Sequence, residues 1–317
     1  RTATDLSRMA TEAMVLLGAA RNPNLALGAS WSAVRPLRFV NRRDAPGRIA
    51  LSDFGPASGA PTLLFHSAVT GSLLDRGLVR ALQAAGMRPI AVERPGFGLT
   101  DPPVGEPLEA AVGDVLALMD TLGLKRVRLV ARGGEPVALE LGRRIPERLQ
   151  RGVLINPFTP YEIDSRWDGF MNRAKRLVTA YPDMIEPLAR FLSRRTSPMA
   201  MERLVRNALR ESAADQAALN NPAIAEDYVA SARLTAARSS WGFVHEQKAY
   251  LTWRPPELAD GRPWVRLIGG QDVLYRAGDA DRLWASALPG HQVIHVPDAG
   301  RLLHASHPEL VAKALNS

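Results

Sequence analysis

Apolar and polar positions alternate along this chain in two recurring patterns. Short, mainly apolar runs such as 62–65 and 127–131 are typical of strands buried on both faces of a parallel sheet. Between these runs, apolar residues at three- and four-residue steps predict helices. Such alternation predicts a doubly wound, mostly parallel sheet. The predicted elements of this first part are a hairpin of 38–40 and 48–54, strands at 62–65, 88–92, 127–131 and 152–156, and helices at 73–85, 110–121 and 136–144.

The pattern changes between residues 158 and 256, where helical periodicity continues without buried strands. We interpret this region as a helical cap inserted into an α/β core. The predicted cap helices lie around 171–181, 188–192, 201–209 and 228–234, and the core resumes with strands at 264–268 and 292–296 and helices at 277–288 and from 308. The predicted domains are an N-terminal segment (1–37) with a helix at 5–20, the two parts of the core (38–157 and 257–317) and the cap (158–256).

Composition narrows the class of protein further. With 317 residues, 46% of them hydrophobic, the chain can bury a large core. No apolar run approaches the roughly 18 residues of a membrane span, so we expect a soluble cytoplasmic protein. Because the chain has no cysteine, it cannot form disulfides or thiolate zinc sites, and we expect neither a metal nor a cofactor. The formal charge of +8 comes mostly from dispersed arginines, which favours a solvated basic surface over a nucleic-acid groove.

Several local sequences, together with the order of elements, carry a resemblance to a known family. Phe65-His66 stands where members place the His-Gly of the oxyanion loop, and 93–101 (ERPGFGLTD) looks like their D-x-R-G-x-G-x-S turn. The segments 139–148 and 153–156 are similar to the helix and strand that follow the nucleophile. From about residue 39 onward the chain resembles the α/β-hydrolase family. This resemblance implies the α/β-hydrolase fold and three defined places for a serine, an acid and a histidine.

Two of these three places hold unsuitable residues. The strand 127–131 leads into Arg132-Gly-Gly-Glu, so Gly133 stands at the nucleophile of the family's G-x-S-x-G elbow and has no side chain to attack a carbonyl. Asp272, in Gly-Gly-Gln-Asp, matches the acid. Arg301 occupies the histidine position, and arginine keeps its proton, so it cannot act as a general base. We therefore expect no triad catalysis.

Arginines near these positions invite two interpretations. Arg301 should lie beside Asp272, and an ion pair that fastens the two loops is the simpler expectation. The alternative is that Arg301 or Arg132 meets an anionic group of a ligand, with Glu135 as a competing partner of Arg132. His304 and His307 follow shortly after Arg301, and we interpret them as surface or interface histidines at a helix start.

A ligand pocket is expected between the cap and the sheet, as in other capped members of this fold. Ser67 replaces the usual glycine of the oxyanion loop, and Ala68 would offer its backbone N–H. Thr70 adds to this polar rim. Most cap aromatics should form the cap's own core, whereas two residues near its return to the sheet are chosen as pocket-lining. The predicted ligand-binding residues are His66, Ser67, Ala68, Arg132, Gly133, Phe243, His245 and Arg301.

The first ten residues (RTATDLSRMA) are similar to the last helix of LuxR-type helix-turn-helix domains. The ending at 299–308 looks like that of regulators which join such a domain to a hydrolase-like domain. This resemblance implies that the chain is the sensory part of a transcription factor whose DNA contacts lie outside it. An ordinary N-terminal helix is the alternative.

Three functions from different classes follow. The main prediction is a non-catalytic sensor domain, as a homodimer, that binds a small, partly apolar ligand with an optional anionic group. The second is an atypical enzyme, such as a lyase, an isomerase or a non-serine hydrolase, that uses Asp272 with Arg132, Arg301 or His245. The third is a pseudoenzyme scaffold whose surface binds a protein.

Overall fold

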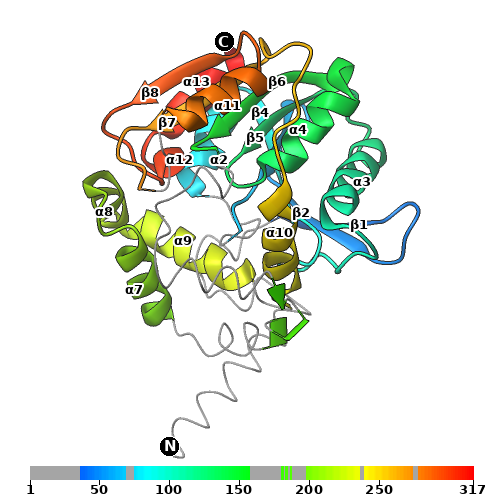
Figure 1. Ribbon diagram of the computed structural model, residues 1–317, viewed down its shortest axis with the longest axis horizontal. Coiled ribbons are helices and arrows are strands. Elements are labelled where there is room, and N and C mark those ends of the chain that lie inside the picture. Colours follow the sequence, from blue (N-terminus) through cyan, green and yellow to red (C-terminus); the bar gives the residue numbers. More distant parts are fainter. Residues whose placement is uncertain are drawn as a thin grey trace, which may run out of the picture.

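The structure is a computed structural model that describes residues 36–68, 75–157, 198–235, 239–273 and 278–317, together with a few positions between 180 and 187. In these residues an eight-stranded sheet runs in the order β1-β2-β4-β3-β5-β6-β7-β8 (Figure 1). The hairpin β1–β2 is antiparallel to its neighbours and the other strands are parallel, which confirms the predicted sheet. The strands are β1 (Leu37–Asn41), β2 (Arg48–Asp53), β3 (Ala60–Phe65), β4 (Met87–Val92), β5 (Val127–Ala131), β6 (Leu149–Ile155), β7 (Trp264–Gly269) and β8 (Gln292–Val296).

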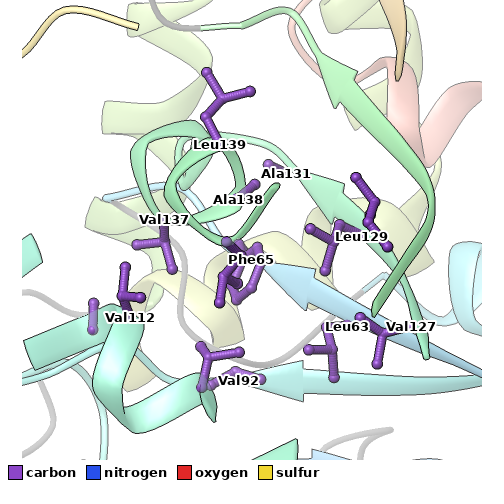
Figure 2. Close-up of a cluster of buried hydrophobic side chains, with 14 of the residues drawn as sticks. Leu63, Phe65, Val92, Val112, Val127, Leu129, Ala131, Val137, Ala138 and Leu139 are labelled. Atoms are coloured by element: carbon purple, nitrogen blue, oxygen red, sulfur yellow. The ribbon is translucent and has the colours of Figure 1, made fainter. Parts of the chain in front are cut away.

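Helices cover both faces of the sheet. Successive side chains of a strand point to opposite faces, so Leu63 and Phe65 of β3 join one core cluster while Leu64 joins the other. Figure 2 shows the first cluster, in which Phe65 lies near side chains of α3 and α4, and Leu63 lies beside Val127 of the neighbouring strand. The first face carries α3 (Pro107–Thr121), α4 (Glu135–Arg144) and α11 (Asp279–Ala287), and the second carries α2 (Arg76–Ala84), α12 (Leu303–Ser306) and α13 (Pro308–Asn316), while the short 3-10 helix η2 (Pro146–Arg148) precedes β6.

The cap helices gather at one end of the sheet (Figure 1). They are α7 (Pro198–Ala208), α8 (Ala213–Leu219), α9 (Pro222–Thr235) and α10 (Trp241–Thr252). The predicted helices at 201–209 and 228–234 correspond to α7 and α9. We did not predict α8, which is short, or α10, whose buried side chains do not form a single stripe. The predicted helix 5–20 and most of the predicted helices 171–181 and 188–192 lie outside the described residues. Within the described part, no helix is both long and apolar enough to cross a membrane.

Three carboxylates, one from each of three cap helices, bind the core at the carboxyl ends of the strands. Asp215 of α8 accepts the backbone N–H groups of Arg301 and Leu302 at 2.9 and 2.7 Å. Asp227 of α9 pairs with Arg76, at the start of α2, at 2.6 Å. Glu246 of α10 accepts hydrogen bonds from Nε and Nη2 of Arg94, at 2.5 and 2.7 Å. Because these carboxylates are at most 5% exposed, each would destabilise the fold without its partner.

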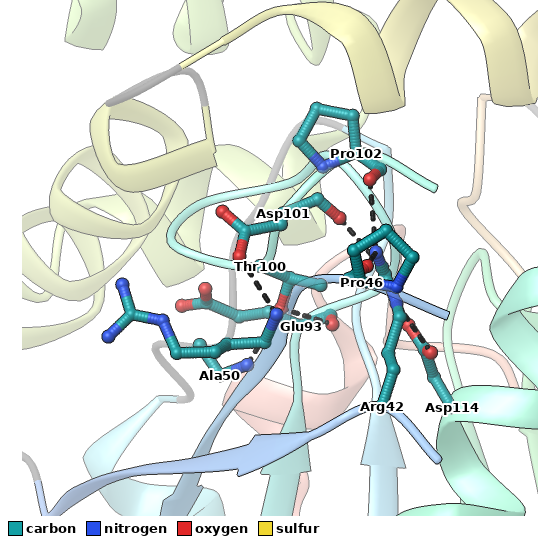
Figure 3. A network of polar contacts seen from close by, with 9 residues as sticks. Arg42, Pro46, Ala50, Glu93, Thr100, Asp101, Pro102 and Asp114 are labelled. Carbon is teal, nitrogen blue, oxygen red and sulfur yellow. Dashed lines mark hydrogen bonds and ion pairs between the residues drawn. The ribbon is translucent and has the colours of Figure 1, made fainter. Parts of the chain in front are cut away.

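A second polar network fixes the turn 94–101 to the hairpin (Figure 3). Arg42 donates to the Asp114 carboxylate of α3 at 2.8 and 3.0 Å, and to the carbonyl oxygen of Asp101 at 2.7 Å. The Thr100 hydroxyl donates to the Glu93 carbonyl and accepts the Ala50 N–H. These contacts hold Arg94 where the cap helix α10 can reach it.

The sheet has no space for a side chain at Gly152. A Cβ added there would overlap the buried ring of Trp264 on the neighbouring strand. We expect Gly152→Ala to lower the free energy of unfolding by about 1–3 kcal/mol through overpacking. Urea denaturation would show this as a lower midpoint with an unchanged slope.

Gly113→Ala, on the exposed side of α3, is the matched control because an added Cβ meets nothing within 4 Å. Alanine favours the helix over glycine by roughly 0.5–1 kcal/mol, so this variant should gain stability. A Gly152→Ala midpoint at or above that of the wild type would contradict the packing argument.

Candidate functional site

A cavity of about 40 Å³ lies at the carboxyl ends of β3, β5 and β6, beneath α9. Ligands of doubly wound sheets bind at this edge. One water needs about 10–15 Å³ of such space, so the cavity has room for several heavy atoms. Its wall is mainly apolar with a few polar groups, as is usual for small-molecule sites. The lining residues are Leu64, Phe65, His66, Ser67, Asp75, Leu78, Val130, Arg132, Ile155, Ile224, Asp227, Tyr228, Ser231, His304 and Ala305.

The elbow after β5 has no space for a nucleophile. Gly133 has a φ of +92°, and a Cβ added there would lie 2.6 Å from the Cα of Ser67. Its N–H donates instead to the buried Glu135 carboxylate at 2.7 Å. The loop that usually leaves room for the serine therefore packs directly against Gly133, so both the nucleophile and its space have been replaced.

Arg301 forms the ion pair that the sequence predicts. Its Nη1 donates to Asp272 Oδ2 at 3.1 Å and to the carbonyl oxygen of Asn156 at 2.9 Å. Burial alone lowers the pKa of Arg301, but the carboxylates of Asp272 and Glu135 outweigh this and raise it above its usual value. Neither Arg301 nor Asp272 lines the cavity. The former acid and base positions thus form a structural pair.

Asn156, at the end of β6, joins the two loops that carry this pair. Its Oδ1 accepts the Gly269 N–H at 2.7 Å, and its Nδ2 donates to the Gly300 carbonyl at 2.9 Å. Sequence reasoning missed this residue. A polar residue that ends an otherwise apolar strand was the available signal.

Arg132 is the cation of the cavity wall. Its Nε donates to the carbonyl oxygen of Arg301 at 3.2 Å, and its guanidinium lies 5.8 Å from the centre of the Tyr228 ring, within range of a cation–π contact. The expected competitor, Glu135, binds the Gly133 N–H instead. Among the described residues no carboxylate pairs with Arg132. Within that part of the chain, its contacts are thus a backbone carbonyl and an aromatic ring.

His304 is half-buried and also lines the cavity, which its interpretation as a surface or interface histidine did not anticipate. Its Nδ1 is buried and has no hydrogen-bond partner in the described part of the chain. Burial lowers the pKa of His304 well below its usual value, and the charges of Arg132 and Arg301 lower it further. The ring is therefore neutral at physiological pH. His304 reaches the cavity because α12 turns back toward the strand ends. His307, in contrast, is partly exposed, and its Nε2 lies 3.5 Å from Asp298.

Both ring nitrogens of His66 form hydrogen bonds that hold the oxyanion loop in place. Its Nδ1 donates to the Ser67 carbonyl at 2.7 Å, and its Nε2 accepts the Arg94 N–H at 3.3 Å. These bonds require a neutral ring and fix its tautomer. His66 therefore positions Ser67 in the cavity wall. Ala68 is half-buried and does not line the cavity, and Thr70 lies outside the described residues.

Phe243 and His245 lie on α10 and do not line the cavity. The His245 ring stacks on Trp241 with 4.2 Å between centroids, and its Nε2 is 3.8 Å from Asp183. The structure therefore brings together three of the predicted ligand-binding residues, His66, Ser67 and Arg132, and places Gly133 directly behind Ser67. Cavity residues that the sequence did not indicate are Asp75, Tyr228, Ser231 and His304.

Asp75 is a buried carboxyl on the wall formed by α2. Its Oδ1 caps this helix by accepting the Leu78 N–H at 3.1 Å. Burial raises the pKa of Asp75 to about 6; the Leu78 N–H opposes this shift and the negative charge of Asp227 adds to it. The carboxyl is therefore protonated near pH 5 in the folded state and ionised near pH 7.5.

Two proteins named as enzymes are similar in sequence to this chain, over 42% and 90% of their own length. A haloalkane dehalogenase of Mycolicibacterium paratuberculosis is 32% identical over 126 residues, which cover 38% of this chain and 42% of that protein. Haloalkane dehalogenase 2 of Mycobacterium bovis is 26% identical over 85% of this chain and 90% of its own. The chain thus matches less than half the length of the first relative and most of the second. The crystal structure of bromoperoxidase from Bacillus anthracis shares the fold, with a TM-score of 0.62 and 19% identity over 88% of this chain and 98% of that one.

These similarities overturn the main functional prediction. We expected a non-catalytic sensor domain of a transcription regulator, yet two relatives in sequence are named as haloalkane dehalogenases, which points to an enzyme. The physical error was to equate the loss of one mechanism with the loss of all chemistry. Gly133 and Arg301 exclude a Ser-His-Asp triad, but His304, Asp75 and Arg132 still line one cavity.

The packing of Ser67 on Gly133 can be measured by substitution. Gly133→Ala adds both backbone strain and an overlap with a backbone atom. Gly86→Ala, at a φ of +80° with open space around it, adds only the strain, which costs about 1 kcal/mol. We expect Gly133→Ala to lose roughly 1–3 kcal/mol more than this control, in urea unfolding. Equal losses would show that the elbow still has room for a side chain.

The raised pKa of Asp75 should appear in the pH dependence of stability. A carboxyl whose pKa is raised on folding contributes stability at low pH, and this contribution is lost as the pH rises through about 6. Asp75→Asn keeps the helix cap and removes the titration. Relative to wild type, the variant should gain about 1 kcal/mol between pH 5 and pH 7.5 in urea unfolding. Asp44→Asn, at an exposed position, should show no such gain.

The match to a protein family covers most of the described core and cap. Residues 61–308 fit the α/β hydrolase fold family, from β3 at the start of the parallel sheet to the first residue of α13. The strand order, the cap and the cavity at the strand ends agree with this match. The chain therefore belongs to the α/β hydrolase fold family.

Proposed function

We propose that this chain is a hydrolytic enzyme that acts on a small carboxylate-bearing substrate by activating water, without a serine nucleophile. The observation that carries the proposal is the pairing, in one cavity, of a neutral histidine that has an unpartnered Nδ1 with an arginine that has no carboxylate partner among the described residues. The similarity to enzymes named as dehalogenases supports hydrolysis as the type of reaction.

Arg132 is the group that would hold the substrate. Arginine binds carboxylates through two parallel hydrogen bonds, and the Tyr228 ring and the Arg301 carbonyl already orient the guanidinium. The apolar residues Leu64, Val130 and Ile155 form the wall beside it. The substrate would therefore present a carboxylate at one end and a short carbon chain toward the strands.

His304 is the group that would activate water. A neutral imidazole can take a proton, whereas Arg301 cannot. In this step a water gives a proton to the ring and its oxygen attacks the substrate carbon, while the bond to the leaving group breaks. The ring then releases the proton to the leaving group or to solvent. Binding of an anion to Arg132 offsets one of the positive charges that lower the pKa of His304, so it would strengthen this base.

Asp272, which the sequence offered as an acid–base group, has a different role in this proposal. Its side chain is fully buried and pairs with Arg301, away from the cavity lining. It would support the loop that precedes His304 and would not exchange protons with the substrate.

Kinetics of two variants test these roles. The probe is 2-chloropropionate, a small carboxylate with a leaving group, followed by chloride release. We expect His304→Gln to lower kcat by roughly 10²–10⁴-fold with little change in KM, because general bases contribute about this much. Arg132→Met should mainly raise KM. The control His307→Gln should behave like wild type, and unchanged turnover in His304→Gln would contradict the proposal.

Oxygen labelling in a single turnover tests the absence of a covalent intermediate. With excess enzyme in H₂¹⁸O, direct attack by water places ¹⁸O in the hydroxyl of the product, lactate. An enzyme carboxylate acting as the nucleophile would deliver unlabelled oxygen in this first turnover. Unlabelled lactate would therefore exclude the mechanism while leaving hydrolysis itself intact.

A further inference from the structure

Asp75 gives the cavity a second charged wall that the proposed mechanism does not use. Its carboxyl lines the cavity, and its hydrogen bonds run to the backbone N–H groups at the start of α2. In the described part of the chain, no arginine, lysine or histidine forms an ion pair with it. Asp75 is thus a buried acid, 9% exposed, that lacks a cationic partner.

The adjacent cation is already committed elsewhere. The Arg76 side chain donates to Asp227 at 2.6 to 3.1 Å and to Glu226 at 2.9 Å, and its backbone N–H also donates to Asp227. This arrangement fastens α9 to α2. Arg76 therefore compensates the charge of Asp75 only from a distance and as the smallest of the contributions to its pKa, whereas the charge of Asp227 adds to the cost of ionising Asp75.

Of the three charged residues that line the cavity in the described part of the chain, Asp227 is paired with Arg76, whereas Arg132 and Asp75 carry opposite charges and do not pair with each other. No ion pair joins Arg132 and Asp75, and each is at most 9% exposed. An unpaired buried charge is costly, so a ligand that satisfies both groups gains more than one that satisfies a single group. A plain carboxylic acid would compensate Arg132 and leave Asp75 without a partner.

We propose that the cavity selects carboxylic acids that also carry a hydrogen-bond donor, a hydroxyl or an ammonium group, with the carboxylate on Arg132 and the donor on Asp75. This inference rests on the proposed function for the site and for the role of Arg132. It adds a specificity-determining residue, Asp75, and narrows the substrate or product class to short hydroxy or amino acids.

Three ligands of equal chain length test the inference by calorimetric titration: propionate, lactate and alanine. A hydrogen bond to a charged group is worth about a tenfold change in affinity or more. We therefore expect lactate, alanine or both to bind the wild type at least tenfold more tightly than propionate. Whichever of the two gains identifies the donor as hydroxyl or ammonium. Arg132→Met should weaken all three ligands.

Two variants separate charge from hydrogen bonding at position 75, and both replacements are good helix caps. Asp75→Asn removes the charge and keeps an acceptor, so a preference for alanine should be lost and one for lactate reduced. Asp75→Ser removes the charge and leaves a single shorter acceptor, the hydroxyl oxygen, which the cap of α2 uses, so every preference over propionate should disappear. A preference that survives in Asp75→Ser would overturn the inference.

A ligand-side comparison covers the case in which the variants do not fold. 2-Methoxypropionate has the shape of lactate with one added methyl group and no donor, and it should bind the wild type no better than propionate. Equal binding of propionate, lactate and alanine would refute the inference. If His304-dependent turnover of 2-chloropropionate is still observed in that case, the proposed function stands. If instead lactate or alanine is preferred but turnover does not depend on His304, only the proposed function is refuted.

Discussion

The attachment of the cap through buried carboxylates is the constraint on which the cavity depends. Asp215, Asp227 and Glu246 come from three consecutive cap helices, and each binds the core at the carboxyl ends of the strands. Asp227 and Glu246 form ion pairs with arginines, and Asp215 accepts hydrogen bonds from backbone N–H groups of the loop after β8. Since all three carboxylates are buried, separating the cap from the core would expose several charges to solvent or leave them buried without a partner. The cavity wall formed by α9 is therefore set by the same contacts that stabilise the fold.

The residues that replaced the triad act as parts of this framework. Arg301 pairs with Asp272 and with the Asn156 carbonyl, while its own backbone N–H is bound by the cap residue Asp215. Gly133 lets Ser67 approach the elbow, and Ser67 then forms part of the cavity wall. A permanently charged arginine suits a structural pair because it does not titrate at physiological pH. The titratable groups that line the cavity lie elsewhere, His304 on α12 and Asp75 at the start of α2.

Sequence reasoning succeeded where the chemistry of a position depends on the residue that occupies it. It identified the strands, the lost nucleophile at Gly133 and the pairing of Arg301 with Asp272, because neighbouring loops in this fold bring those two positions together. It did not place His304 in the cavity, because the local sequence does not distinguish His304 from His307, which is also half-buried but does not line the cavity. It also chose Phe243 and His245 from their nearness to the cap's return, although α10 directs them away from the cavity.

The sequence by itself determined the fold and excluded one mechanism, because hydrophobic periodicity and the identity of single residues are local properties. Only the tertiary structure decided what the site contains. Asp75, Arg132 and His304 are separated by long stretches of chain, and nothing in their spacing shows that they share a cavity. Which charges find partners is likewise decided in space: Arg76 is held by Asp227 and Glu135 by the Gly133 N–H. That arrangement leaves Arg132 and Asp75 in the cavity wall without an ion-pair partner among the described residues.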